Sequence, residues 1–307
     1  MTMTAIDMFA GLGGNSEGAK QAGVHVLWAG NHWKVAKEYH ERNHPEAVTV
    51  CQDMHQAAWD RVPSHDLLMA SPACTGHTEA RGKEQPHHDA ARSTAWAVID
   101  AVEFHRPPFL LVENVPAFAK KWVLYPAWCA ALSALGYALA PIIIDAADCG
   151  VPQHRKRLIV IGTRTRHPVV LDLPKLQHRP ATEVIDFTAG SWSQVNKPSR
   201  VPATLARIAR GRREFGDRFV MPYYGGGSGL TGRDLARPIG TITTRDRWAI
   251  VDGERMRMLT RDENRRAMAF PDDYQLPEEH KLAVHMLGNA VPPPMTREVI
   301  TALRKAA

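Results

Sequence analysis

The chain has few cysteines and no long apolar run, and these absences exclude several classes of protein. Its four cysteines form no CxxC pair, which argues against a zinc site or a disulfide framework and is typical of a protein from a reducing cytoplasm. No apolar run approaches the roughly 20 residues that a membrane span needs. The first residues, MTMTAIDMF, lack the basic and apolar regions of a signal peptide. We therefore expect a cytoplasmic protein with no bound metal and no membrane partner.

The composition is that of a globular protein with an uneven distribution of charge. Hydrophobic residues make up 44% and charged residues 23% of the 307 residues, which is enough chain for one large and one small unit. The net charge is +6, but the segment 197–266 alone holds 16 Lys or Arg against 8 Asp or Glu. The rest of the chain is therefore slightly acidic. A basic segment of this kind favours a polyanionic partner, although a solvated arginine-rich surface explains the charge equally well.

The first 165 or so residues alternate short apolar runs with helix-compatible stretches. Short, continuous apolar runs are typical of buried parallel strands. Alternation of such strands with helices predicts a doubly wound, mostly parallel α/β sheet, whose ligands bind beyond the carboxyl ends of the strands. The predicted strands are Ala5–Phe9, Val24–Ala29, Asp66–Ala70, Phe109–Glu113 and Leu158–Gly162; the predicted helices are Ser16–Ala22, Trp33–Arg42, Ser93–Phe104 and Pro126–Leu135.

From about residue 166 the pattern changes, because Pro, Gly, Ser and Arg become frequent and regular periodicity is weak. This composition predicts a small irregular domain with a flexible glycine loop at Gly225–Gly229. A helical pattern returns at Thr296–Lys305. We therefore expect one domain from residues 1–174 and 275–307 and a second from residues 175–274.

A glycine turn follows the first predicted strand, in the sequence DMFAGLGGNSEG. Glycines allow the backbone to turn tightly and to approach a ligand at the N-terminus of a helix. The dinucleotide fingerprint GxGxxG would need glycine at Ser16, so a nicotinamide or flavin site is disfavoured. A nucleoside-type ligand and an unliganded tight turn both remain compatible with the turn.

Cys74 directly follows another predicted strand, in the sequence SPAC. That position is where α/β enzymes carry out chemistry, and a thiolate is a strong nucleophile. Cysteines are more often buried and inert, so this motif does not establish a nucleophile by itself. The polar segment Thr75–Ala91 that follows has the composition of a lid over a site.

Two further motifs place charged residues next to predicted strands. Glu113 ends a strand among apolar residues, where burial of a carboxylate is costly unless it has a task such as holding a proton. Arg155 and Arg157 are spaced to lie on one face of the next strand, where they would clamp a carboxylate, a phosphate or a polar base edge. The alternatives are a Glu that caps a turn and a solvated basic run.

Taken together and in order, these motifs resemble the DNA (cytosine-5) methyltransferases of bacterial or phage type. DMFAGLGG is similar to the family's cofactor loop, SPAC to its nucleophile motif, ENV to its carboxylate motif and QHRKR to its basic motif. The segments RPIGTITTRDR, RMLTRDENRRAMAFPDDY and LGNAVPPPM resemble its late motifs. The resemblance covers nearly the whole chain.

The resemblance implies a mechanism in which Cys74 adds to C6 of a cytosine that has been flipped out of double-stranded DNA. C5 then accepts a methyl group from S-adenosylmethionine. In this scheme Glu113 binds N3 and the exocyclic amine, Arg157 holds O2, and Arg155 supports the site. The resemblance further implies a monomer whose DNA specificity resides in the second domain.

The same resemblance assigns residues to the cofactor pocket. It places methionine and adenosine against the glycine turn, adenine between Trp33, Asp53 and Met54, and the pocket's closure at two polar residues. The assigned residues are Phe9, Gly11, Leu12, Gly13, His32, Trp33, Asp53, Met54, Thr94 and Asn289. Two of the chain's residues depart from the family pattern: Ala73 stands where proline usually precedes the nucleophile, and His32 stands where an acid usually bonds the ribose.

Two other functions share these motifs. A catalytically silent DNA-binding relative is disfavoured because Cys74, Glu113 and Arg157 are all present. An RNA cytosine methyltransferase on the same scaffold stays open, because some members of the family act on transfer RNA. Methylation of duplex DNA compared with transfer RNA separates the alternatives.

Overall fold

The chain folds into two compact units in a computed structural model that describes residues 2–73, 93–223 and 231–306. The first unit comprises residues 1–145, 156–174 and 291–307, and the second comprises residues 146–155 and 175–290. The ranges expected from sequence assign residues 146–155 and 275–290 to the first domain, whereas these two segments pack within the second unit.

The first unit is built on a seven-stranded sheet with the order β3-β2-β1-β4-β5-β7-β6. Strands β1 to β5 run parallel, and β7 is antiparallel to both β5 and β6. The strands are β1 (Thr4–Met8), β2 (His25–Asn31), β3 (Val48–Cys51), β4 (Leu67–Ala70), β5 (Phe109–Asn114), β6 (Ala138–Asp145) and β7 (Lys156–Thr163).

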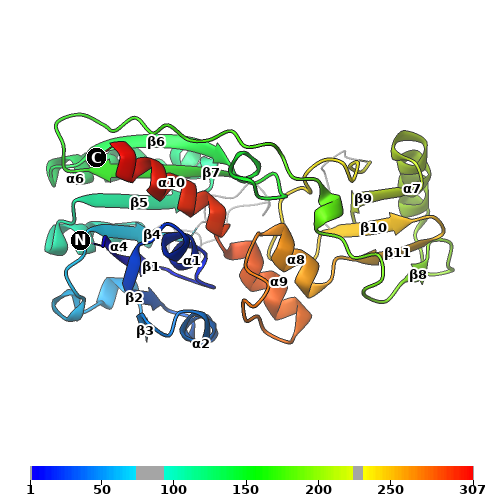
Figure 1. The fold of residues 1–307 in the computed structure, drawn as a ribbon, viewed down its shortest axis with the longest axis horizontal. Helices are drawn as coiled ribbons and strands as arrows, with labels where there is room; N and C mark the ends of the chain where they lie inside the picture. The colour runs from blue at the N-terminus through cyan, green and yellow to red at the C-terminus, as the bar shows by residue number, and fades with distance from the viewer. Residues whose placement is uncertain (1, 74–92, 224–230, 307) are drawn as a thin grey trace. The chain divides into compact units, whose positions relative to one another are not determined.

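Helices cover both faces of this sheet (Figure 1). They are α1 (Gly14–Gln21), α2 (Lys34–Asn43), α4 (Trp96–His105), α5 (Pro116–Lys121), α6 (Tyr125–Ala134) and α10 (Pro293–Ala306). Two short 3₁₀ helices, Met54–Gln56 and Trp59–Arg61, follow β3. Helices α1 and α10 lie side by side, and a Cβ at Gly18 of α1 would come within 2.5 Å of the carbonyl oxygen of Pro293 in α10. Glycine is therefore required for their close approach.

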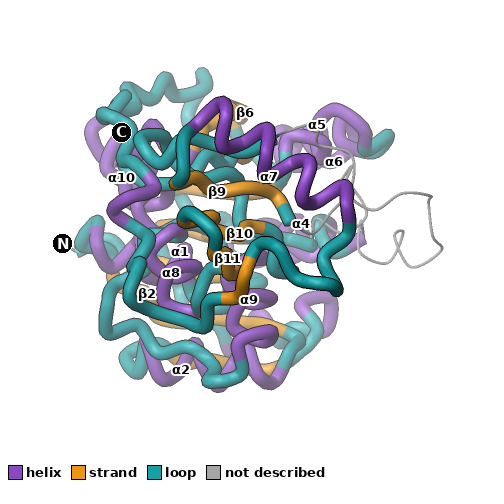
Figure 2. The backbone as a smooth tube through the Cα atoms, turned by 90° about the vertical axis from the view of Figure 1, so that its right-hand side faces the viewer, coloured by secondary structure: helices purple, strands orange, loops and turns teal. Residues whose placement is uncertain are grey.

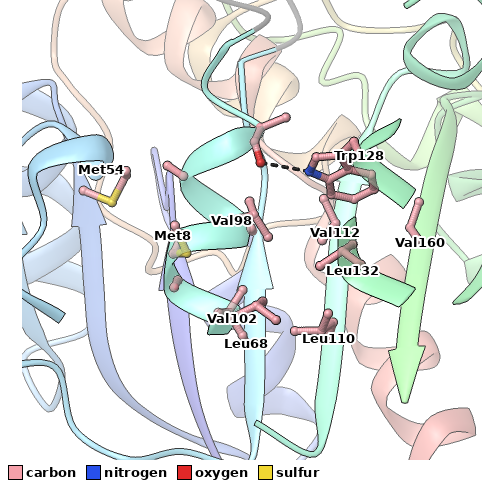
Figure 3. Close-up of a cluster of buried hydrophobic side chains, with 14 of the residues drawn as sticks. Met8, Met54, Leu68, Val98, Val102, Leu110, Val112, Trp128, Leu132 and Val160 are labelled. Carbon is pink, nitrogen blue, oxygen red and sulfur yellow. Dashed lines mark hydrogen bonds between the residues drawn. The ribbon is translucent and has the colours of Figure 1, made fainter. Parts of the chain in front are cut away.

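The core of the first unit lies between the sheet and helices α4 and α6 (Figure 3). Ile6, Leu68 and Leu110 come from three neighbouring strands, and Val98 and Trp128 come from the helices. Trp128 is fully buried, and its indole N–H donates to the Ala95 carbonyl at 2.9 Å. The only polar group of this large side chain is thus satisfied inside an apolar cluster.

The five predicted strands and the predicted helices of this unit are confirmed, with ends shifted by three residues or fewer. Strands β3 and β6 were not predicted. Both lie at the edges of the sheet. Strand β3 has only four residues, and Pro141 interrupts the apolar run of β6, which argues against a strand in a sequence pattern. Within the described residues, no helix has the length and apolar character needed to cross a bilayer.

The second unit contains more regular structure than the expected irregular domain. Its sheet has the order β8-β11-β10-β9 and is antiparallel. The strands are β8 (Ser193–Gln194), β9 (Arg218–Pro222), β10 (Trp248–Asp252) and β11 (Arg255–Met258); the helices are α7 (Pro202–Phe215), α8 (Arg261–Ala267) and α9 (His280–Asn289). The strands have at most five residues, and two arginines interrupt β11, so these segments are too short or too mixed for a periodic pattern to reveal them.

Helix α7 packs along β9, as Figure 2 shows from the side of this unit. A Cβ at Gly211 of α7 would come within 2.3 Å of the Phe219 ring, so this contact also depends on glycine. Two more short 3₁₀ helices, Ala146–Cys149 and Ala181–Glu183, belong to the unit. The predicted glycine loop at 225–229 lies outside the described residues.

Candidate active site

The site lies in the first unit, at the carboxyl ends of its parallel strands. Strands β1 and β4 are neighbours although two strands separate them in sequence, so the sheet changes its winding direction between them. In open α/β sheets, ligands bind at such a switch point. The segment after β1 is the glycine turn, and the segment after β4 leads to Cys74. The topology therefore brings two of the predicted motifs to one edge.

The glycine turn has a left-handed backbone at three positions. The φ angles are +60° at Phe9, +55° at Gly11 and +93° at Gly13, and α1 begins at the next residue. Phe9 is the exception among them, since a side chain at positive φ is strained and persists where the surroundings enforce it. Leu12 is 1% exposed and anchors the turn in the unit. The structure thus presents an α1 N-terminus beneath a tightly wound backbone.

The predicted adenosine contacts follow the next two strands. His32 and Trp33 come directly after β2, and Asp53 and Met54 come after β3. His32 and Asp53 are exposed, Trp33 is half-buried and Met54 is buried. One Asp53 carboxylate oxygen accepts from the His55 amide at 3.0 Å, which fixes the local turn. The four residues therefore occupy the same strand edge as the glycine turn.

Three successive residues before Cys74 are held by side chains from elsewhere in the first unit. The hydroxyl of Ser71 accepts from the Asn15 amide at 3.0 Å, and the Pro72 carbonyl accepts from the Asn114 amide at 3.1 Å. The Ala73 amide donates to the Thr94 hydroxyl at 3.0 Å. The segment is thus tightly positioned up to the residue before Cys74. Cys74 itself and the predicted lid at 75–91 lie outside the described residues.

Glu113 and Arg157 form a buried ion pair. Strands β5 and β7 are antiparallel neighbours, so the end of β5 meets the start of β7. The Arg157 Nε lies 3.0 Å from the Glu113 Oε1, with side-chain exposures of 13% and 10%. Each buried charge is compensated by the other, because an unpaired carboxylate or guanidinium here would be expensive. The structure therefore brings together two of the predicted catalytic side chains.

The sequence spacing predicted that Arg155 and Arg157 lie on one strand face, and this prediction is wrong. Strand β7 begins at Lys156, and Arg155 belongs to the second unit. Its buried guanidinium donates to the carbonyls of Ile242, Gly288 and Ala290 at 2.8–2.9 Å. These bonds join three segments of the second unit, because each carbonyl lies more than eighty residues away. These bonds thus give Arg155 a structural role within the second unit.

Asn289 also belongs to the second unit, at the end of α9, whereas the other predicted cofactor residues belong to the first. Its side chain is exposed, and its amide nitrogen lies 3.3 Å from the His285 Nε2. Its part in closing the pocket stays a prediction. Thr94, by contrast, lies in the first unit and holds the segment before Cys74.

Three polar residues of the site region were not singled out from the sequence: Asp7, Asn15 and Asn114. All are buried. Asp7 is the next-to-last residue of β1, and its Oδ2 accepts from the Ser16 hydroxyl at 2.8 Å, while burial raises its pKa to about 7. In the sequence, only their positions mark these three residues: Asn114 follows Glu113, and the other two lie on either side of the glycine turn. Polar residues next to strand ends in an α/β sheet are the pattern that would have found them.

Solved structures of methyltransferases share this fold. A mutant form of Spodoptera frugiperda DNMT2 matches with a TM-score of 0.70 and 17% identity over 99% of this chain and 100% of that one. S. pombe Dnmt2 methyltransferase matches with a TM-score of 0.69 and 14% identity over 99% of each chain. The chain thus has an α/β methyltransferase fold, with the doubly wound and mostly parallel sheet that the sequence predicted.

The family follows from the sequence comparisons. The family of C-5 cytosine-specific DNA methylases matches residues 3–199 and 222–305, and the chain belongs to this family. The Type II methyltransferase M.HgiDI of Herpetosiphon aurantiacus is 30% identical over 98% of this chain and 94% of its own length. M.NlaX of Neisseria lactamica, another Type II methyltransferase, is 26% identical over 98% of this chain and 96% of its own length. The resemblance inferred from seven ordered motifs is confirmed.

Proposed function

We propose that the chain methylates C5 of cytosine in double-stranded DNA, using S-adenosylmethionine and a covalent adduct at Cys74. The observation that carries the proposal is the buried Glu113–Arg157 pair. It adjoins the segment before Cys74, because Asn114 follows Glu113 and bonds the Pro72 carbonyl at 3.1 Å. The segment that leads to Cys74 thus lies next to the strand end that carries this pair, which supports a site in which the Cys74 thiolate acts beside Glu113 and Arg157.

The residues around the glycine turn fit S-adenosylmethionine. Among the residues that the structure describes, a Cβ built at Gly11 would meet no atom closer than the Phe9 carbonyl oxygen at 3.8 Å, so they leave space above the turn. The α1 N-terminus suits the carboxylate of the methionine moiety. The exposed Asp53 would accept from the adenine amine, and His32 would bond a ribose hydroxyl. When bound, this cofactor supplies an electrophilic methyl group on a sulfonium.

The chemistry begins at C6 because cytosine is a poor nucleophile at C5. Addition of the Cys74 thiolate to C6 makes C5 enamine-like, so that C5 takes the methyl group. Glu113 binds N3 and the exocyclic amine, and Arg157 binds O2, which stabilises the adduct. Loss of the C5 proton to a base and expulsion of the thiolate restore the aromatic ring. The base must leave the duplex stack for these groups to reach it.

We assign target recognition to residues 175–274 of the second unit. This range includes the segment 197–266, whose excess of Lys and Arg suits a polyanion. Duplex DNA is favoured over RNA because M.HgiDI and M.NlaX carry Type II methyltransferase names. Binding to duplex DNA should weaken steeply with salt, since phosphate contacts release counterions. A flat response between about 50 and 200 mM salt would contradict this assignment.

The sharpest test traps the covalent adduct. With 5-fluorocytosine in a recognised site, methyl transfer leaves no proton at C5 to remove, so the adduct persists. Denaturing electrophoresis should show a protein–DNA band that depends on S-adenosylmethionine. Substitution Cys74→Ser should abolish the band while DNA binding is retained, and Cys51→Ser and Cys149→Ser are the matched controls that should leave it intact.

Two outcomes would overturn parts of the proposal. A band that forms in Cys74→Ser, or DNA mapped to another cysteine, would refute the assigned nucleophile. Methylation of transfer RNA in preference to duplex DNA, measured with radiolabelled cofactor, would refute the substrate. Genomic DNA from cells that express the chain, sequenced after bisulfite treatment, would identify the target sequence.

A further inference from the structure

Helix α1 carries a buried amide whose bonds reach two distant segments. Asn15 is 3% exposed. Its Nδ2 donates to the Ser71 hydroxyl at 3.0 Å, and its Oδ1 accepts from the Thr296 hydroxyl at 2.7 Å. Asn15 therefore ties α1 to the segment after β4 and to α10. Buried side-chain amides need such partners, so each bond restrains the position of the segment it reaches.

Ser71 is bonded to both ends of the glycine turn. Its backbone amide donates to the Met8 carbonyl at 3.1 Å, and its hydroxyl accepts from Asn15. Met8 lies just before the turn and Asn15 lies just after it. A change in the turn that moves the start of α1 relative to the end of β1 must therefore either carry Ser71 with it or break one of these bonds. Ser71 is the third residue before Cys74 in the chain.

We propose that Asn15 is a positioning residue that couples occupancy of the glycine turn to the reactivity of Cys74. This inference rests on the proposed function, in which the turn holds S-adenosylmethionine. Binding fixes the left-handed backbone of the turn, and the Asn15–Ser71 bond passes that restraint to residues 71–73. The cofactor thereby prepares the nucleophile's segment before cytosine arrives.

The bonds of Asn15 to Ser71 and to Thr296 allow a test that distinguishes this role from simple support of the fold. Substitution Thr296→Val removes the hydroxyl that bonds Asn15 from α10 but leaves the bond to Ser71 possible. Substitution Ser71→Ala removes the Asn15–Ser71 bond and leaves the bond to Thr296 possible. Both variants lose one neutral hydrogen bond at Asn15, so their losses of thermal stability should be similar. Their effects on Cys74 should differ.

The experiment measures Cys74 in two ways. One is the single-turnover rate of adduct trapping on 5-fluorocytosine duplex at saturating S-adenosylmethionine. The other is the rate of Cys74 alkylation by iodoacetamide, mapped by mass spectrometry with and without S-adenosylhomocysteine. In wild type we expect S-adenosylhomocysteine to change the alkylation rate. Asn15→Ala and Ser71→Ala should lose that response and trap about threefold to tenfold more slowly, the rate equivalent of one hydrogen bond.

The double variant Asn15→Ala with Ser71→Ala should trap no more slowly than Asn15→Ala alone, because the bond that Ser71→Ala removes is already lost in Asn15→Ala. Thr296→Val should trap within about twofold of wild type, by the additivity expected of an independent contact. The inference is overturned if Asn15→Ala keeps the alkylation response, or if Thr296→Val slows trapping as much as Asn15→Ala does. If Asn15→Ala does not fold, Ser71→Ala decides by the same readouts.

Failure of the proposed function gives a different result. A wild-type protein that traps no adduct counts against the assigned chemistry. The alkylation response to S-adenosylhomocysteine then still tests the coupling, because it needs ligand binding but no turnover. Loss of that response in Ser71→Ala would support the coupling, and its persistence would refute it.

Discussion

Each unit contains a buried Arg–Glu pair, and the two pairs have different surroundings. In the first unit, Glu113 and Arg157 meet at the carboxyl edge of a parallel sheet, where both side chains keep about a tenth of their surface exposed. In the second unit, Arg257 and Glu263 are at most 2% exposed, with two contacts of 2.6 and 2.7 Å. One pair can reach a ligand and the other cannot.

The second pair is also hydrogen-bonded to the backbone. Glu263 also accepts from the amides of Asp186 and Thr260, and Arg257 donates to the Asp186 carbonyl. Thr260 and Glu263 form a capping box that begins α8. The comparison shows that a count of arginines in a segment overstates the charge that is available to a polyanion. Arg200, Arg257 and Arg265 are buried within the basic segment.

The largest expected difference between the units is their response to acid. Burial lowers the pKa of His40 to about 3 and the pKa values of His44 and His65 to about 4, all in the first unit. These groups stabilise the fold above pH 6.5, and that stability is lost as the pH falls from 6.5 toward 4. Each contributes up to about 1.4 kcal/mol per pH unit in that window. The raised pKa of Asp7 has the opposite effect, because its contribution to stability is present below pH 4 and is lost toward pH 7. One such group offsets the acid sensitivity of only one of the three histidines.

The second unit should respond in the opposite sense at His280. Its bond to Asp246 raises the pKa of His280, so this contribution is full below pH 6.5 and is lost as the pH rises through the folded value. Hydrogen exchange at pH 7.5 and pH 5 should therefore show faster opening of first-unit peptides at the lower pH. Substitution His40→Gln should reduce the difference. Equal acid sensitivity of the two units would contradict the assignment.

The next effect is on stability in the second unit. Substitution Glu263→Ala leaves the Arg257 charge buried without a partner and should cost about 3–5 kcal/mol. Denaturant unfolding measures the loss. Glu254→Ala is the matched control, since Glu254 pairs with Arg212 but is 72% exposed, and it should cost about 1 kcal/mol or less. A loss of stability in Glu263→Ala as small as that in Glu254→Ala would contradict the proposed difference between buried and exposed pairs.

In the first unit, Glu113→Gln should act on chemistry. The amide keeps the shape of the side chain but lacks the charge and proton affinity that the adduct needs. We expect methylation to slow by about 100- to 1000-fold, the usual cost of one group that stabilises developing charge. Duplex DNA binding should change little. Radiolabelled methyl transfer and a binding titration give both numbers, and full activity in the variant would exclude Glu113 from the site.

The smallest effect concerns His32, which stands where the family usually has an acid. Substitution His32→Glu should tighten S-adenosylmethionine binding by about tenfold, because a carboxylate accepts from ribose hydroxyls more strongly than a neutral imidazole. Calorimetry on both proteins measures the change. The exposed His25 provides a control substitution, His25→Glu, that should leave affinity unaltered. Unchanged affinity in His32→Glu would remove His32 from the pocket.

Much of the first unit was predictable because its interactions are local or periodic. Central parallel strands are buried on both faces, so β4 and β5 appear as apolar runs, and β1 does so except at Asp7. The glycine turn, SPAC and ENV adjoin strand ends, which places them at one sheet edge before any coordinates are known. The order of the motifs along the chain identified the family.

Tertiary structure alone decided which side chains meet. The Glu113–Arg157 pair depends on the antiparallel register of β7 against β5, and the bonds of Asn15 join residues 56 and 281 positions away. Arg155 and Arg157 are two residues apart, yet one bonds carbonyls of the second unit and the other bonds a glutamate of the first. Sequence spacing specifies the chemical groups that are available. Pairing register and burial determine which of them become structural and which face a ligand, because both depend on contacts between distant segments.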